Sequence, residues 1–223
     1  MADGLIALKP DEVQALLAMA RRQIAWDPRM PVRLRSSGAA IGMYTVPPFD
    51  VLALFAVPAS VDREIDATIP LASLITALEV AAANDRPIDL ARITEAPAPL
   101  IGARGMSVAT LPPAEGWHLP IKAMSGDVLV SVDEAVAEFT RRATGQVEAL
   151  QQQIADEIWS RPAWASLPMR VLHAAARLGM LANDRSRISA AVAGKWKRLS
   201  TARGHVLIDA SAQSVQLPLS VLR

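Results

Sequence analysis

The sequence predicts an α+β fold: an N-terminal helix with a small antiparallel sheet, then a helical C-terminal half that ends in a β-hairpin. Three observations favour this class. Residues 31–69 alternate apolar and polar side chains or form short apolar runs, as strands do. Residues 125–199 repeat apolar side chains at helical spacing. Because the strands precede these helices instead of alternating with them, the pattern argues against a doubly wound parallel sheet.

The first half of the chain is expected to hold two helices and three or four strands. A helix over residues 10–26 begins at Pro10, which suits the first helical position. Strands at residues 31–36 and 39–46 flank the turn Ser37-Gly38 and form a hairpin. The run 51–57 is continuously apolar, as in a strand covered on both faces, and 63–69 alternates again. A helix then extends from Pro70 to about Asn84.

Residues 86–123 contain six prolines, which exclude a long regular element. Short strands are expected near 105–111 and 117–121. A loop of this length is expected to pack along the sheet or to form part of a site. It is also the best place for a domain boundary, so we expect an α+β region over 1–123 and a mostly helical region over 124–223. The alternative is one continuous core.

Four helices and a hairpin are expected in the second half. Ser131 and Glu134 have the spacing of a capping box for a helix that ends near Ala143, with an alternative start near Asp127. Further helices are expected at residues 146–160, 167–180 and 186–199. The last strand, 205–208, is expected to pair with residues 215–222.

The most asymmetric feature is a basic stretch, residues 161–203. It carries nine positive charges against one acid, Asp184, whereas the net charge of the whole chain is +1. Such a stretch suggests a basic face for an anionic partner. The alternative is a solvated face, or one that pairs with acidic residues of the same protein.

The element order of this stretch (helix, helix, turn, basic helix, hairpin) is similar to a winged-helix arrangement. The resemblance implies nucleic-acid binding through phosphate and base-edge contacts, whose strength would depend on salt. The residues that it places at that interface are Arg187, Lys195, Lys197, Arg198 and Arg203.

The remaining candidate site residues favour structural roles. Trp159 and Trp164 are expected to fill the junction between two helices, although arginine stacking on them could create a ligand platform. Trp196 is expected in the core. His118, His173 and His205 are isolated and lack metal-ligand spacing. The chain has no phosphate-binding loop and no nucleophile elbow, so we predict no catalytic residue, no metal and no cofactor.

Three functions follow, in order of preference. The first is a non-catalytic binding protein that associates with a protein partner or with itself, because the composition is apolar-rich and the net charge is near neutral. The second is a nucleic-acid-binding regulator that uses the basic stretch. The third is an enzyme with a nonlocal site in the loops near Arg104 and His118.

The chain is expected to be cytoplasmic and to have no membrane partner. Its most apolar window, residues 51–59, is much shorter than the roughly 20 residues of a membrane-spanning helix. The N-terminus has no basic region of the kind that opens a signal peptide. The chain also has no cysteine, which excludes disulfides and thiolate chemistry.

Overall fold

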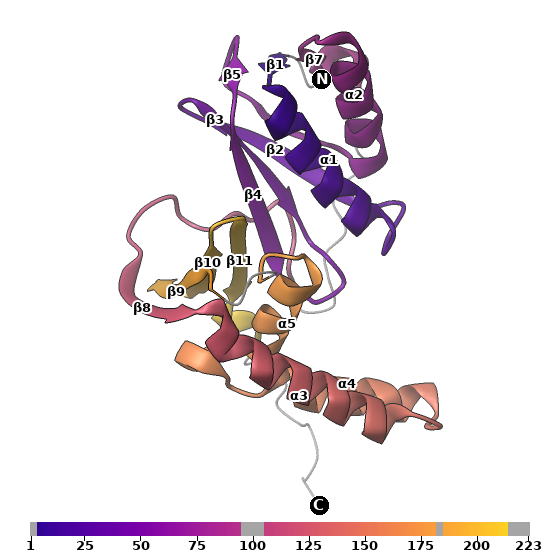
Figure 1. The fold of residues 1–223 in the computed structure, drawn as a ribbon, viewed down its shortest axis with the longest axis vertical. Coiled ribbons are helices and arrows are strands. Elements are labelled where there is room, and N and C mark those ends of the chain that lie inside the picture. Colours follow the sequence, from indigo (N-terminus) through magenta and orange to yellow (C-terminus); the bar gives the residue numbers. More distant parts are fainter. Residues whose placement is uncertain (1–3, 95–104, 182–184, 214–223) are drawn as a thin grey trace, which may run out of the picture.

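A single eight-stranded antiparallel sheet organises the computed structural model, which describes residues 4–94, 105–181 and 185–213 (Figure 1). In the order in which they lie side by side, the strands are β6 (Asp66–Pro70), β2 (Pro31–Ser37), β3 (Ala40–Thr45), β4 (Leu52–Pro58), β11 (Gly204–Asp209), β10 (Trp196–Thr201), β9 (Arg187–Ala193) and β8 (His118–Met124). Four strands come from each half of the chain. The halves meet where β4 pairs with β11.

A second, three-stranded sheet lies at one end of the first half. Its order is β5 (Ser60–Val61), β1 (Leu5–Ala7) and β7 (Ile88–Asp89). The short strand β1 thereby holds the start of the chain against the segment that follows the second helix (Figure 1).

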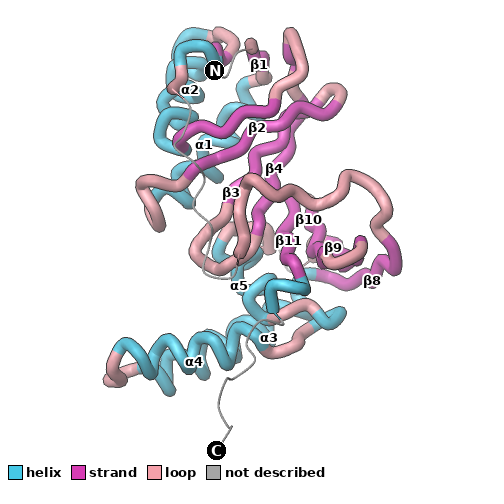
Figure 2. The backbone as a smooth tube through the Cα atoms, turned by 180° about the vertical axis from the view of Figure 1, so that it is seen from behind, coloured by secondary structure: helices cyan, strands magenta, loops and turns pink. Residues whose placement is uncertain are grey.

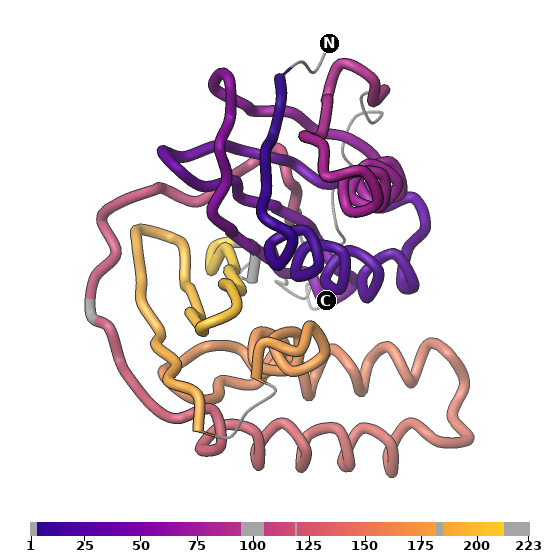
Figure 3. The backbone as a smooth tube through the Cα atoms, turned by 45° about the horizontal axis from the view of Figure 1, so that its top comes forward, coloured from indigo at the N-terminus to yellow at the C-terminus, as the bar shows by residue number. Residues whose placement is uncertain are grey.

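The helices share one face of the large sheet. The first half contributes α1 (Pro10–Ile24) and α2 (Leu71–Asn84), which pack together. The second half contributes α3 (Ser125–Ala143), α4 (Glu148–Ser160) and α5 (Met169–Arg177). Figures 2 and 3 show α3 and α4 as an antiparallel hairpin that extends away from the sheet, with α5 next to β11. Three short 3-10 helices, η1 (Leu90–Arg92), η2 (Trp164–Ser166) and η3 (Ala210–Gln213), complete the described elements.

Both faces of the sheet are covered. The main core lies between the sheet and the helices and joins the two halves, for example through Leu17 of α1, Phe55 of β4 and Val171 of α5. On the opposite face, Leu52, Trp196 and Leu207 form a second cluster with Met106 and Val108. The segment 105–117 therefore crosses the outer face of the sheet. This agrees with the expectation that the proline-rich region packs along the sheet.

The α+β class is confirmed, but the expected sheet of three or four strands is too small. Helix α1 begins at Pro10, with Asp11 and Glu12 in its first turn, as predicted. Helix α3 begins at Ser125, close to the alternative start near Asp127 and not at Ser131. There the Asp127 carboxylate accepts a hydrogen bond of 2.9 Å from the Met124 backbone N–H, which caps the helix start.

The largest correction concerns residues 186–199, which were expected to form one helix. They form the β9–β10 hairpin instead, with Gly194 at φ +55 in its turn. Helices cover one face of this hairpin and residues 105–117 cover the other, so apolar side chains point to both sides. Ile188 and Leu199 face the main core, whereas Trp196 faces the second cluster. Because apolar residues lie on both faces of these two strands, their spacing along the sequence resembles that of an amphipathic helix, which led to the wrong prediction.

The winged-helix resemblance does not hold, because the basic helix on which it depended is a hairpin. Strand β11 pairs with β10 and β4. The proposed hairpin partner, residues 215–222, and the turn residues 183 and 184 lie outside the described residues. Residues 105–111 form turns and not a strand, whereas the strand expected at 117–121 is present as β8. Over the described ranges, no helix is both long and apolar enough to cross a membrane.

Candidate functional site

The five basic residues predicted to bind nucleic acid all lie on the second half of the large sheet, but they do not form one patch. Arg187 begins β9 and Arg203 lies in the β10–β11 turn, at one end of these strands. Lys195 lies in the β9–β10 turn, at the opposite end. Lys197 and Arg198 are adjacent in β10, so their side chains point to opposite faces of the sheet.

Most of these cations have partners within the chain. The Lys195 ammonium lies 2.6 Å from the Asp209 carboxylate. Lys197 Nζ donates to the Ser166 carbonyl oxygen at 2.7 Å, and Arg203 Nη1 donates to the Gly179 carbonyl oxygen at 3.1 Å. Arg187 is exposed. Lys195 therefore fits the alternative in which basic residues of this stretch pair with acidic residues of the same protein.

Arg161 is neutralised in the same way. Its guanidinium lies 2.6 Å from Glu138 and 2.6 Å from Glu157, and Arg142 bonds to the same two carboxylates. Hydrogen bonds from Arg161 and then from Arg142 lower the pKa of Glu138 to about 2. The network ties α3, α4 and the residue after α4 together, and it removes Arg161 from any free basic face.

Arg198 differs from the other basic residues, because residues 105–117 cover its guanidinium group on the outer face of the sheet. Its guanidinium carbon is 4.0 Å from the centroid of the Trp117 ring, a cation–π contact. Burial lowers the pKa of Arg198, and burial followed by the charge of Arg198 lowers the pKa of His205. His205 Nδ1 lies 2.9 Å from Ser200 Oγ, so these polar groups and Trp117 share one face of the sheet.

The other end of the crossing segment is also fixed by an arginine. Arg33 of β2 donates to the carbonyl oxygens of Val108 at 3.1 Å and Ala109 at 3.0 Å, while it forms a bidentate pair with Asp66. Hydrogen bonding to Asp66 raises the pKa of Arg33. The segment is thus held by Arg33 on the first half of the sheet and by Arg198 on the second.

The edge strand β8 presents exposed apolar side chains on this half, as the helical hairpin does with Val130 and Val147. It pairs with β9 on one side, and no strand among the described residues pairs with its other side. Ile121 is 49% exposed and Met124 is 38% exposed. Pro120 lies in the middle of the strand, where the register shifts between His118 and Ile121. An interior proline and an irregularity are features of edge strands. Sequence reasoning missed this surface because an edge is defined only by which strands pair.

The structure shows the surroundings of His118, which was considered for an enzyme site, and of His173. His118 is exposed at the start of β8, and Arg104 lies outside the described residues. His173 is half-buried and contacts the rings of Trp159 and Phe49, which supports the structural role expected for the tryptophan. Across the described residues, no group of three metal-ligating side chains is assembled.

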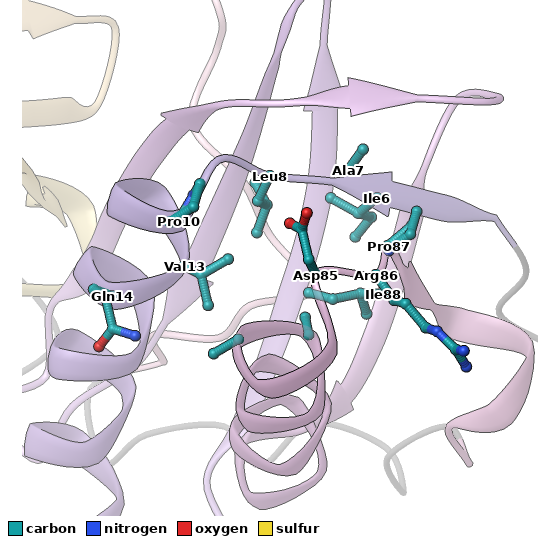
Figure 4. Close-up of a pocket in the computed structure, with 12 residues that line it drawn as sticks. Ile6, Ala7, Leu8, Pro10, Val13, Gln14, Asp85, Arg86, Pro87 and Ile88 are labelled. Atoms are coloured by element: carbon teal, nitrogen blue, oxygen red, sulfur yellow. The ribbon is translucent and has the colours of Figure 1, made fainter.

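The cavity drawn in Figure 4 lies in the first half, between β1, the start of α1 and the end of α2. It has a volume of about 260 Å³, and Ile6, Leu8 and Val13 line it. Asp85, in the left-handed conformation at the end of α2, directs its carboxylate toward Leu8, whereas Arg86 points away (Figure 4). The cavity is thus mainly apolar with one acidic group, and none of the five predicted residues lines it.

Two family models, both described as domains of unknown function, match the two halves of the chain. Residues 1–99 match DUF8010, and residues 112–213 match DUF8185. A comparison with curated proteins finds no match.

The fold is similar to that of bacterial DNA polymerase sliding clamps. The ligand-bound DNA polymerase sliding clamp from Pseudomonas aeruginosa is 10% identical with a TM-score of 0.53, over 93% of this chain and 64% of that chain. Pol III beta from Caulobacter crescentus is 11% identical with a TM-score of 0.52, over 92% and 64%. The DNA polymerase III beta subunit from Thermotoga maritima is 11% identical with a TM-score of 0.52, over 93% and 64%. The chain therefore spans less than two thirds of the length of these clamps, and the likeness is one of fold.

Proposed function

We propose that this chain is a non-catalytic assembly protein that extends its large sheet by pairing the open edge of β8 with a second copy of the chain. The observation that carries the proposal is the edge itself, with its exposed Ile121 and Met124. An open edge offers unpaired backbone donors and acceptors, and an added strand satisfies them while apolar side chains are buried.

The charges at the two ends of the sheet favour contact between different edges. Lys122 on β8 and Arg187 on the adjacent β9 are exposed and basic. The opposite edge, β6, is preceded by the exposed Glu64, whereas Asp66 on β6 itself is already paired with Arg33. Opposite charges steer association and set its register. A head-to-tail contact leaves one free edge at each end of the assembly, so it closes into a ring or continues to grow.

The test is the mass of the protein in solution, measured by size-exclusion chromatography with light scattering. We expect the wild type to form an oligomer, and Ile121→Glu with Met124→Glu to shift it to monomer. The control is Val147→Glu, which changes an equally apolar residue that is 72% exposed in the turn before α4. A wild type that stays monomeric at high concentration would rule out the proposal.

A charge-swap experiment distinguishes the two geometries of assembly. Head-to-tail pairing predicts that Lys122→Glu and Glu64→Lys each weaken self-association and that mixing the two variants restores a heterodimer. Pairing of β8 with β8 predicts that Glu64→Lys has no effect, which would overturn the head-to-tail arrangement.

DNA association is the second candidate function, favoured by the similarity of the fold to that of DNA polymerase sliding clamps. The charges of the helices oppose it. Together α1 to α5 carry ten acidic and six basic residues, whereas DNA-binding surfaces need Lys and Arg to replace counterions. Fluorescence anisotropy with duplex DNA at low and physiological salt tests this candidate. Binding that survives physiological salt and is lost in Arg187→Glu, but not in Arg92→Glu, would promote it above assembly.

A further inference from the structure

A cavity of about 410 Å³ lies on the helix side of the sheet, where the two halves of the chain meet. Its walls come from α1, β4 and the end of α5, with Met19, Phe55 and Leu178 among the apolar residues that line it. Two arginines from different halves, Arg22 of α1 and Arg203 of the β10–β11 turn, complete the lining. The volume lies within the range of small-molecule sites, about 300–1,000 Å³.

The two arginines converge on one glycine. Arg203 Nη1 donates to the Gly179 carbonyl oxygen at 3.1 Å. The Arg22 guanidinium occupies the space that a Cβ atom on Gly179 would need, and Gly179 has φ +74, which favours glycine. The absence of a side chain on Gly179 therefore makes room for the Arg22 guanidinium next to the residue whose carbonyl oxygen Arg203 binds.

This pair of cations has no acidic partner. No carboxylate forms an ion pair with Arg22 or Arg203 in the described part of the chain, and none of the residues that line the cavity is acidic. Arg21, the neighbour of Arg22 in sequence, does have such a partner, because it lies 2.7 Å from Glu79. Both arginine side chains are exposed, so each guanidinium keeps N–H donors that can form charge-assisted hydrogen bonds to a small anion.

We propose that this cavity, lined by Arg22, Arg203, Met19, Phe55 and Leu178, binds a small carboxylate that has an apolar body. The arginines receive the carboxylate, whose two oxygens match the paired donors of a guanidinium. The apolar walls receive the remainder of the ligand, which gains free energy by leaving water. The proposal depends on the cavity alone and not on the assembly through β8.

Isothermal titration of the full chain with octanoate tests the site. We expect one molecule to bind per chain, and Arg22→Gln or Arg203→Gln to weaken binding by about tenfold or more, because each removes a charge-assisted hydrogen bond. Arg29→Gln is the matched control, since that side chain is 86% exposed and pairs only loosely with Asp27. Ala18→Trp, a change at an exposed lining residue, should fill the cavity and abolish binding while both arginines remain.

Three further probes decide what the site recognises. Acetate has the charge without the apolar body, and 1-octanol has the apolar body without the charge, so each should bind at least tenfold more weakly than octanoate. Equal binding of either probe, or binding that is unchanged in both arginine variants, would overturn the proposal. No octanoate binding at about 1 mM would also overturn it. A short DNA duplex that binds through Arg22 and Arg203, and that octanoate does not displace, would identify a phosphate site instead.

Discussion

At the scale of single residues, His173 shows how an ionisable group can have a packing role. It lies in a line of five rings, Trp26, Phe49, His173, Trp159 and Phe139, with neighbouring centroids 4.3–5.9 Å apart. The line begins after α1 in the first half and ends on α3 in the second. Burial, followed by the charge of Arg177, lowers the pKa of His173 to about 4. The ring therefore packs in its neutral form at neutral pH.

This shift predicts a pH dependence of stability. The unfolded chain takes up a proton at His173 near its ordinary pKa of 6.5, whereas the folded protein resists protonation down to about pH 4. The contribution of the neutral His173 ring to the free energy of unfolding is thus fully present above pH 6.5 and is lost as the pH falls from 6.5 to 4. We expect the melting temperature, followed by circular dichroism, to fall by several degrees over this window.

The variant His173→Phe isolates this contribution, because it keeps a ring in the line and removes the titration. Its melting temperature should fall less steeply between pH 6.5 and 4. A residual slope remains from His205, whose pKa is lowered in the same direction, and near pH 4.5 from Glu138 and Glu157, whose pKa values are lowered to about 2. The exposed His118 is the control, and His118→Gln should keep the wild-type slope. If His173→Phe and the wild type have the same slope, His173 does not titrate as described.

At the scale of elements, the α3–α4 hairpin is held by a small core of its own. Ala135 of α3 packs with Ile154 and Ile158 of α4, and these residues form a cluster separate from the main core. On the surface, the charged network of Glu138, Glu157, Arg142 and Arg161 links the same helices. Exposed ion pairs contribute little to stability, so the apolar cluster carries most of the hairpin's stability.

Replacing Ile158, which is 0% exposed, tests this conclusion. Ile158→Ala leaves a cavity and should lower the free energy of unfolding by about 2–5 kcal/mol. Because the cluster is local, amide hydrogen exchange should accelerate more in α3 and α4 than in the large sheet. Leu150→Ala, at a position of α4 that is 38% exposed, should have a smaller effect. Uniform loss of protection over the whole chain would show instead that the hairpin does not open separately.

At the scale of the whole molecule, the seam between β4 and β11 joins the halves. Ala53 and Val206 are paired across it, and both are 0% exposed. Arg170 of α5, which is 5% exposed, extends across the same junction to within 4.0 Å of Asp50 and bonds to Ser160 Oγ at 2.5 Å. We therefore propose that the expected regions 1–123 and 124–223 fold as one cooperative unit.

The variant Val206→Asp tests cooperativity. It buries an unpaired carboxylate at the seam and should lower the free energy of unfolding by about 3 kcal/mol or more. Hydrogen exchange measured by mass spectrometry should show β2 and β3 losing protection together with β9 and β10. Val80→Asp, at a position that is 54% exposed on α2, is the control and should change stability little. Loss of protection confined to the second half would show that the halves unfold independently.

The candidate sites illustrate what proximity in sequence cannot show. The basic stretch was predicted from its own composition, but acids from other elements neutralise part of it: Glu138 and Glu157 pair with Arg161, and Asp209 pairs with Lys195. Conversely, the cation pair of the proposed carboxylate site joins residues far apart in sequence, Arg22 and Arg203. Long-range contacts decide which charges remain free.

The sequence by itself determined the α+β class, the helices α1, α2 and α4, and the strands β2, β3 and β4. Local signals specify them: Pro10, the Ser37-Gly38 turn, one-sided apolar periodicity and, for β4, a short apolar run between turn signals. Only the tertiary structure decided that residues 187–201 are strands and that the two halves share eight of them. Where both faces of a sheet are covered, apolar residues no longer alternate, and the local pattern stops distinguishing strand from helix. Strand order, open edges and shared cavities depend on contacts between distant segments, which the spacing of residues along a chain does not encode.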